Sequence, residues 1–382
     1  MRILLVSMSS IHFFRWTNQL EQAGHEVYWF DIRDGEPSNR IPFVKQIHGW
    51  KQKYPNLKGR HFFKKKLPKL YERFNFLIEN KVEDTFESLL QDIKPDLVHS
   101  FALQISCIPI LDVMKKYINT TWVYSAWGSD LFYKNNKPNY ENDLREVLLR
   151  VDYLFTDCLR DYQIALNYGF KGEYLGCFPG GGGFYTPKLK EFILTPISGR
   201  SIILVKGYQG EHGRCIQVIK ALIKLSFHLK KYKIIVFAAD EEVVSYVEGN
   251  NICDILNIKL LYKDKFISHL EILKLMGASL IYIGNSQSDG MPNTLLEAIT
   301  MGAFPLQSNP GNATSEIINH GENGFLIEDI EDVEEMEQLV LKALFDMNLL
   351  INAFNINQVV HKPRLERKRI KGEVLAAYNS IH

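Results

Sequence analysis

A short polar turn in the C-terminal half carries the residues best suited to chemistry. Asp289, Gly290 and Pro292 stand in this turn, after an apolar run and before a helical pattern. Pro292 suits the first helical position, because its missing N–H would have had no partner there. Gly290 lacks a side chain, so the backbone can approach a ligand closely at this point.

The helix that follows would begin with the unpartnered N–H groups of Asn293, Thr294 and Leu295. The helix dipole favours an anion at such a start, which predicts a diphosphate site. Glu297 lies just over a turn further on, where its carboxylate can accept two hydrogen bonds from a vicinal diol such as a ribose. The alternative is a plain polar turn and a capped helix, with Glu297 at the edge of the core.

The elements that position this turn follow an α/β rhythm in two halves. Unbroken apolar runs predict buried parallel strands, and helical patterns lie between them. In the first half we expect strands over residues 2–7, 26–32, 96–101, 121–126, 153–157 and 173–178. In the second half we expect strands over residues 201–206, 234–239, 258–263, 280–285, 304–308 and 324–328. The fold class is therefore α/β, with two separate Rossmann-like sheets.

Helix signals support the same division. The periodic apolar residues predict helices over residues 13–23, 81–93 and 214–229, and Gly24 ends the first of them. Ser268 and Glu271 have the spacing of a capping box, which predicts a helix that ends near Met276. A tail helix is expected over residues 364–381, after Pro363.

The run Gly180–Gly183, with Pro187 close behind, is the best candidate for a domain boundary. We expect an N-terminal domain over 1–184, a C-terminal domain over 185–363 and a tail helix over 364–382. Ligands of such folds bind at the carboxyl ends of the strands, so the expected site is a cleft between the halves. The glycines would serve as a hinge, as a close approach to a ligand phosphate, or as a plain connector.

Composition excludes several classes of function. The chain has 382 residues, of which 46% are hydrophobic and 23% charged, as in ordinary globular proteins. Its net charge of +1 gives no electrostatic case for a nucleic-acid partner. The five cysteines are widely spaced, which favours a reducing compartment. With no apolar run long enough for a membrane helix and no signal-peptide pattern at the start, we expect a cytoplasmic protein.

The spacing Asp289-x7-Glu297 resembles the acidic-x7-Glu motif of the large retaining glycosyltransferase family 4, which has the GT-B fold. That family usually has Glu at the first position, where this chain has Asp289. The run from Gly311 to Ile327 resembles the family's G-x-x-E-I-I-x-x-G-x-N-G-x-L sequence. The resemblance implies two Rossmann-like domains that face each other across a cleft, and a C-terminal helix that returns to the N-terminal domain.

By this resemblance, Glu297 would hold the ribose of a nucleotide, and Asp289 and the backbone of Gly290–Pro292 would face the donor sugar. The family also places a basic pair after the first strand of its second domain. Lys206 and Arg214 would here bind the donor phosphates, whose negative charge grows as the glycosidic bond breaks. The remaining expected contacts with the nucleotide sugar are Gly207, Met291, Asn293, Thr294 and Leu295. Without the resemblance, Lys206 would simply be a charge at the end of a strand.

The N-terminal half offers softer candidates. Ser10 can cap the first helix, and His12 follows it toward the expected cleft; a capped helix with a solvated His is the alternative. The segment that ends in Asp130 resembles the family's HGxD-like loop, with Trp127 where a His is common. Asp130 would contact a sugar or would cap the next helix. His99 ends a strand, where a lone His is more often a packed residue.

The resemblance implies a retaining transfer from a nucleotide-diphosphate sugar, with UDP-sugars favoured, to a glycan, lipid-linked or protein acceptor. The transferred group would be a hexose or an N-acetylhexosamine, in the synthesis of bacterial surface polysaccharide or glycoconjugate. No Asp-x-Asp and no His/Cys cluster suggests a metal, so we expect no metal and no cofactor. Two alternatives remain: a sugar-nucleotide epimerase of GT-B shape, and a non-catalytic protein that binds nucleotide sugars.

The segment 58–73 is basic and amphipathic. It combines Lys64–Lys66 with Phe62, Phe63 and Leu67. A solvated charged face is the default interpretation of such a run. The hypothesis is a segment that contacts the inner face of the membrane and brings the protein to a lipid-linked acceptor.

Overall fold

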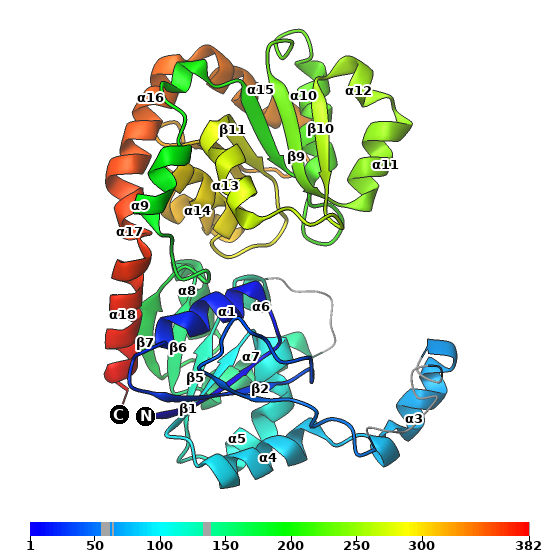
Figure 1. The fold of residues 1–382 in the computed structure, drawn as a ribbon, viewed down its shortest axis with the longest axis vertical. Helices are drawn as coiled ribbons and strands as arrows, with labels where there is room; N and C mark the ends of the chain where they lie inside the picture. Colours follow the sequence, from blue (N-terminus) through cyan, green and yellow to red (C-terminus); the bar gives the residue numbers. More distant parts are fainter. Residues whose placement is uncertain (55–61, 63–64, 133–138, 382) are drawn as a thin grey trace. The chain divides into compact units, whose positions relative to one another are not determined.

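The computed structural model describes residues 1–54, 62, 65–132 and 139–381 (Figure 1). The chain divides into two compact units. The first unit consists of Met1–Thr156, Asp161–Gly181 and Val374–His382. The second unit consists of Asp157–Arg160 and Gly182–Glu373. The passage from Gly181 to Gly182 falls within the glycine run that the sequence marks as a boundary.

The first unit is built on a parallel sheet of seven strands in the order β3-β2-β1-β4-β5-β6-β7. The strands are β1 (Arg2–Ser7), β2 (Glu26–Asp31), β3 (Lys45–Ile47), β4 (Leu97–Phe101), β5 (Thr121–Ser125), β6 (Tyr153–Thr156) and β7 (Glu173–Cys177). All neighbouring strands pair in parallel. Six of the seven strands were predicted from apolar runs; β3 is short and half-buried and has no such run.

Short helices connect these strands. They are α1 (Ile11–Thr17), α3 (Pro68–Ile78), α4 (Val82–Ile93), α5 (Leu111–Lys116), α6 (Ser129–Phe132), α7 (Tyr140–Arg150) and α8 (Leu159–Asn167). The first helix is shorter than predicted, because α1 continues as a 3-10 turn over Asn18–Leu20. Gly24, at φ +76°, follows this turn in the left-handed conformation that suits glycine.

The second unit has a parallel sheet of six strands in the order β10-β9-β8-β11-β12-β13. The strands are β8 (Ile202–Lys206), β9 (Lys233–Ala239), β10 (Ile258–Tyr262), β11 (Ser279–Gly284), β12 (Phe304–Ser308) and β13 (Phe325–Ile327). These match the predicted strands to within two residues. The order is that of a doubly wound dinucleotide-binding sheet, in which the direction of winding reverses between β8 and β11.

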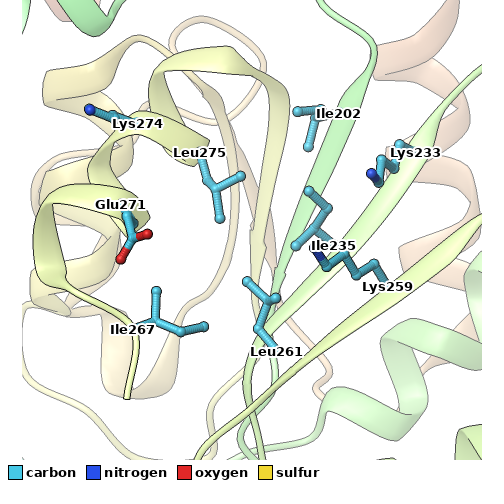
Figure 2. Close-up of a pocket in the computed structure, with 9 residues that line it drawn as sticks. All are labelled: Ile202, Lys233, Ile235, Lys259, Leu261, Ile267, Glu271, Lys274 and Leu275. Carbon is cyan, nitrogen blue, oxygen red and sulfur yellow. The ribbon is translucent and has the colours of Figure 1, made fainter. Parts of the chain in front are cut away.

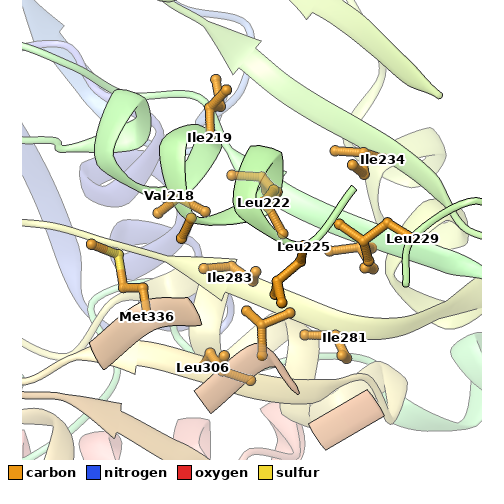
Figure 3. Close-up of a cluster of buried hydrophobic side chains, with 14 of the residues drawn as sticks. Val218, Ile219, Leu222, Leu225, Leu229, Ile234, Ile281, Ile283, Leu306 and Met336 are labelled. Carbon is orange, nitrogen blue, oxygen red and sulfur yellow. The ribbon is translucent and has the colours of Figure 1, made fainter. Parts of the chain in front are cut away.

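Helices cover both faces of this sheet (Figure 1). The helices of this unit from α9 to α17 are α9 (Thr186–Leu189), α10 (Cys215–Lys224), α11 (Glu241–Gly249), α12 (Ile252–Ile255), α13 (His269–Ala278), α14 (Asn293–Met301), α15 (Val333–Phe345), α16 (Met347–Ile356) and α17 (Lys362–Arg364). Ile203 and Val205 of β8 are buried in one apolar cluster and Leu204 in another. The strand is therefore buried on both faces, which is why its sequence is an unbroken apolar run. Figure 3 shows the first cluster, with Val218 and Leu222 of α10 against the strands.

The last helix, α18 (Arg367–Asn379), joins the first unit from Val374 onward. Its Tyr378 hydroxyl accepts a hydrogen bond from Trp16 Nε1 at 3.1 Å, and it is bonded to His99 Nδ1 at 2.5 Å. The end of the chain thus packs on the sheet of the first unit. Pro363 lies inside the short helix α17, in the first turn, where a missing N–H costs little.

Within the part of the chain that the structure describes, no single helix has the length and apolar character to cross a bilayer. One pair of helical segments, Val333–Phe345 and Met347–Arg364, meets these criteria when taken together, but it bends by 90°.

Candidate functional site

Two of the predicted site residues meet where the winding of the second sheet reverses. Lys206 is the last residue of β8, and Asp289 follows β11, the neighbouring strand. The Lys206 Nζ atom lies 3.7 Å from Asp289 Oδ2, and the Lys206 side chain is 10% exposed. Ligands of doubly wound sheets bind outside the carboxyl ends of the strands at this reversal. The sequence predictions therefore converge at the place where the fold favours a ligand.

The two loops at this point are joined by backbone hydrogen bonds. The Arg214 N–H donates to Asn285 O at 3.0 Å, and the Gln287 N–H donates to His212 O at 2.9 Å. Gly213 lies between these contacts, and a Cβ there would stand 2.1 Å from the Tyr208 carbonyl oxygen. Only glycine fits this position, so the loop after β8 holds a fixed path beside the loop after β11.

Arg214 has a role in the structure that the sequence did not reveal. Its guanidinium donates to the Gly213 carbonyl at 2.8 Å and also bonds Gln287 and Glu331. The hydrogen bond from Gln217, together with Arg214, lowers the pKa of Glu331 below its usual value. Arg214 therefore fixes the two loops in this structure, and its contact with a donor phosphate stays a prediction.

Gly207 is required by the sheet. Its N–H donates to Phe237 O at 2.8 Å, and its carbonyl accepts from the Asp240 N–H at 3.0 Å. A Cβ at this position would stand 2.6 Å from the Ala239 Cα atom. The Gly207 N–H is thus bonded to β9, and a contact of Gly207 with the donor stays a prediction.

The turn at Gly290 is held from within the second unit by residues that lie far away in sequence. A Cβ at Gly290 would stand 2.2 Å from Asp157 Oδ1, so the carboxylate of Asp157 takes the space of a side chain. Arg160 Nη1 donates to the Asp289 carbonyl at 2.9 Å and to the Pro310 carbonyl at 2.7 Å. Nothing in the spacing of Asp157 and Arg160 marks them in the sequence as partners of this turn.

The start of α14 differs in register from the prediction. The helix begins at Asn293, and Pro292 is its N-cap rather than its first residue. The Pro292 carbonyl accepts from the Leu295 N–H at 3.0 Å, so the prediction of an unpartnered Leu295 N–H is wrong. The Thr294 hydroxyl accepts a hydrogen bond from the Tyr282 hydroxyl at 2.9 Å. The Met291 side chain is buried with the apolar cluster under the helix, so only its backbone can serve a ligand.

Glu297 is buried in α14, with a side chain 5% exposed. His269 Nε2 lies 2.6 Å from Glu297 Oε1. His269 is the first residue of α13, which starts with the predicted capping box: Ser268 Oγ accepts from the Glu271 N–H at 3.2 Å, and Glu271 Oε2 accepts from the Ser268 N–H at 2.9 Å. The capping box is confirmed. It was the one sequence signal that could have drawn attention to His269.

The run from Gly311 to Ile327 connects loops of the second unit by hydrogen bonds. The Glu316 carboxylate accepts from the Leu159 N–H at 2.8 Å and the Arg160 N–H at 2.9 Å. Asn323 is fully buried, accepts from the Asn319 N–H at 2.7 Å and donates to the Ile317 carbonyl at 2.9 Å. Through Arg160, this run supports the turn that carries Asp289.

The N-terminal candidates lie in the first unit. The Ser10 hydroxyl caps α1 by accepting from the Phe13 N–H at 3.1 Å, as predicted. His12 is exposed in the first turn of α1, with its ring 6.0 Å from that of Trp127. Their contact with a donor stays a prediction.

Asp130 does not cap the next helix, and its expected contact with a sugar stays a prediction. Its carboxylate is buried and accepts from the Leu103 N–H at 2.9 Å, the Trp127 N–H at 2.9 Å and the Tyr124 hydroxyl at 2.6 Å. Burial raises the pKa of the Asp130 carboxyl, while the hydrogen bonds oppose this effect. Asp130 lies inside α6 rather than at its N-cap, and it ties the segments after β4 and β5 together.

His99 is a packed residue, which is the more common case for a lone histidine in a strand. It is fully buried, stacks on Phe101 with 4.1 Å between ring centroids, and bonds Ser125 Oγ at 2.8 Å. Burial lowers the pKa of His99 to about 3, so the ring is neutral at physiological pH.

A cavity of about 540 Å³ lies elsewhere in the second unit (Figure 2). Its walls include Ile202 and Lys233, the first residues of β8 and β9, and Leu275 of α13. Its walls also include Leu261 of β10 and Glu271 of α13, and neither Lys206 nor Asp289 lines it.

Comparison with known families decides what these two units are. Residues 204–353 match the family Glycosyl transferases group 1, and residues 2–158 match the family Glycosyl transferase 4-like. The chain belongs to the GT4-type glycosyltransferases. No curated protein sequence matches this glycosyltransferase.

Solved structures share the fold of the glycosyltransferase. Anabaena Alr3699/HepE, in complex with UDP and glucose, is 14% identical with a TM-score of 0.69, and the alignment covers 100% of each chain. A glycosyltransferase from Rickettsia africae is 15% identical with a TM-score of 0.67, over 99% of this chain and 97% of that one. Sucrose-phosphate synthase from Thermosynechococcus elongatus is 13% identical with a TM-score of 0.68, over 99% and 98%. The glycosyltransferase therefore has the GT-B fold.

Proposed function

We propose that the protein transfers a hexose or an N-acetylhexosamine from a UDP-sugar to a hydroxyl group of its acceptor, with retention of configuration. The observation that supports this most is the meeting of Lys206 and Asp289 at the reversal of the second sheet. Glu297 lies in the helix that starts at the same turn. Lys206 supplies a positive charge for the diphosphate of a nucleotide sugar. The carboxylates of Asp289 and Glu297 can accept hydrogen bonds from the hydroxyl groups of the sugar and of the ribose.

Lys206 is suited to stabilise the leaving diphosphate. Its ammonium group lies 4.7 Å from the centre of the Tyr208 ring, and its side chain is largely buried. A cation in such a water-poor position stabilises developing negative charge more strongly than one in bulk water. The start of α14 adds backbone N–H groups and the positive end of a helix dipole.

UDP is the nucleotide we propose for the donor. Structures of Anabaena HepE contain UDP, UDP with glucose, and UDP-glucose, and HepE aligns with the whole of this chain. We also propose that the reaction uses no metal and no cofactor. In that scheme the leaving phosphate takes the acceptor proton, and the protein supplies position and charge.

The direct test is a thermal-shift screen with UDP-, GDP- and ADP-sugars. A bound donor raises the apparent stability by mass action, about 2.7 kcal/mol at a hundredfold excess over Kd. Assays with candidate acceptors then follow transfer, and NMR of the product reports the anomeric configuration. An epimerase would convert a UDP-sugar without any acceptor. A non-catalytic protein would bind the donor and turn over none of the acceptors.

We further propose that α3 brings the protein to the inner face of an anionic membrane that holds a lipid-linked acceptor. Leu70, Phe74 and Leu77 lie at helical spacing on α3 and are about half exposed. Lys65 and Lys66 precede them and are exposed. Exposed apolar side chains beside lysines fit the surface of an anionic bilayer. Of the predicted basic segment, residues 58–61 and 63–64 lie outside the described residues.

Vesicle sedimentation tests this contact. The wild-type protein should pellet with vesicles that contain anionic lipid and remain in solution with neutral vesicles. The double variant Lys65→Ala/Lys66→Ala should lose most of this binding, whereas Lys230→Ala/Lys231→Ala, a matched change in the second unit, should retain it. Equal binding of both variants would refute the membrane role.

A further inference from the structure

We propose that His269 is a positioning residue, which holds the Glu297 carboxylate so that it selects a ribose over a deoxyribose in the donor nucleotide. This inference rests on the proposed function, in which Glu297 binds the ribose diol. It extends that function to a residue that no family motif marks.

The contact is short and lies in a buried place. His269 Nε2 and Glu297 Oε1 are 2.6 Å apart, and the Glu297 side chain is 5% exposed. An ionised carboxylate can only accept hydrogen bonds, so Nε2 must carry a proton and donate it. A buried carboxylate is costly to desolvate without such a donor. His269 therefore compensates for the burial of Glu297.

The elements around His269 fix its position. The capping box of Ser268 and Glu271 closes the first turn of α13, and His269 is the first residue of that turn. Leu273 and Met276 of α13 pack in the same apolar cluster as Leu295 of α14. The helix that carries the hydrogen-bond donor and the helix that carries its acceptor are thus locked to each other.

The geometry also restricts the carboxylate. Each carboxylate oxygen has two lone-pair positions, and the bond from His269 takes up one of these four positions. Both hydroxyl groups of a vicinal diol can donate hydrogen bonds to one carboxylate only when that carboxylate has a particular orientation. Because the bond from His269 already fixes Oε1, the Glu297 side chain loses less conformational entropy when it binds the diol. This strengthens the binding of a ribose relative to a sugar without the diol.

The experiment compares the affinity of the full-length protein for UDP and for 2′,3′-dideoxy-UDP, by calorimetry. We expect the wild type to prefer UDP about tenfold or more, because the diol donates hydrogen bonds to a charged group. His269→Phe, which keeps a planar ring and removes the donor, should reduce this preference about fivefold or more by weakening UDP binding alone. His269→Gln, which keeps a donor group, should restore most of it.

The matched control is His228→Phe, since His228 is an exposed histidine of the same unit that contacts Phe227 and Phe345. It should leave both affinities unchanged. If His269→Phe does not fold, as judged by thermal melting, His269→Ala takes its place in the comparison.

The outcomes separate the two claims. A wild-type protein that binds none of UDP, GDP and ADP contradicts the proposed function itself. A wild type that binds UDP and dideoxy-UDP equally contradicts the role of Glu297 at the ribose, and with it the role of His269. A wild type that discriminates, with a His269→Phe variant that discriminates equally well, overturns the role of His269 alone.

Discussion

Lys206 Nζ lies 3.7 Å from Asp289 Oδ2, and the two residues follow adjacent strands on either side of the reversal in strand order. The two side chains compensate each other's charge. A diphosphate that arrives at the start of α14 would compete for Lys206 and release Asp289 toward the sugar. The next two predictions, on Lys206 and Asp289, depend on this exchange of partners.

Lys206→Ala should lower the rate of sugar transfer at saturating donor about 10²–10³-fold, because it removes a charge that stabilises the leaving group. Steady-state kinetics with the donor found in the screen gives this number. Lys263→Ala is the control: Lys263 also lies over the Tyr208 ring, at 4.6 Å, but pairs with Asp240. The prediction fails if the two variants lose the same amount of activity.

Asp289→Asn should lower turnover about tenfold or more while it changes the affinity for UDP less than about threefold, since the expected partner of Asp289 is the sugar. Asp289→Glu introduces the acid that is usual in the family and should retain most of the turnover. Parallel calorimetry and kinetics separate the two quantities. An Asp289→Asn enzyme with normal turnover would show that the sugar does not contact this acid.

Gly290→Ala should weaken donor binding about tenfold or more, because the new methyl group would stand 2.2 Å from Asp157 Oδ1 and displace the turn. The matched change is Gly199→Ala, where a Cβ meets no atom within 4 Å. Calorimetry with UDP compares the two. Normal UDP binding by Gly290→Ala would mean that the turn adapts without loss of the site.

His99 should make the first unit less stable in acid. Burial lowers its pKa to about 3, whereas an exposed histidine ring has a pKa of 6.5. As pH falls below 6.5, His99 therefore takes up a proton in the unfolded chain but stays neutral in the folded chain. The free energy of unfolding then decreases by up to about 1.4 kcal/mol per pH unit. Above pH 6.5 this contribution is fully present.

Urea unfolding followed by tryptophan fluorescence measures this effect. All five tryptophans, at positions 16, 29, 50, 122 and 127, lie in the first unit. His99→Gln should be less stable at pH 7, because it disturbs the bonds to Ser125 and Tyr378, and should show a shallower slope between pH 7 and pH 5. Equal slopes would contradict the assignment of a neutral, buried His99.

Local patterns predicted most of the fold. Val205 and its neighbours in β8 form an apolar run because the strand is buried on both faces, and such runs recur at nearly every strand. The capping box at Ser268 is equally local, since its two partners are three residues apart. These signals depend only on short-range spacing, which the sequence contains in full.

The contacts that hold the turn of Asp289 and Gly290 in place could not be predicted from such local patterns. Arg160 holds the Asp289 carbonyl across 129 positions of sequence, and Asp157 fills the space that Gly290 leaves. The close packing of Gly207 against β9 likewise has no signal in the sequence. Such contacts depend on the packing of distant segments, for which one sequence carries no local signal.

The most direct measurement is a crystal structure of the protein with UDP. We expect the diphosphate at the start of α14 beside Lys206, with the ribose hydroxyls on Glu297 and Glu297 still bonded to His269. UDP bound elsewhere, such as in the cavity lined by Ile202 and Leu275, with Lys206 still paired to Asp289, would contradict it.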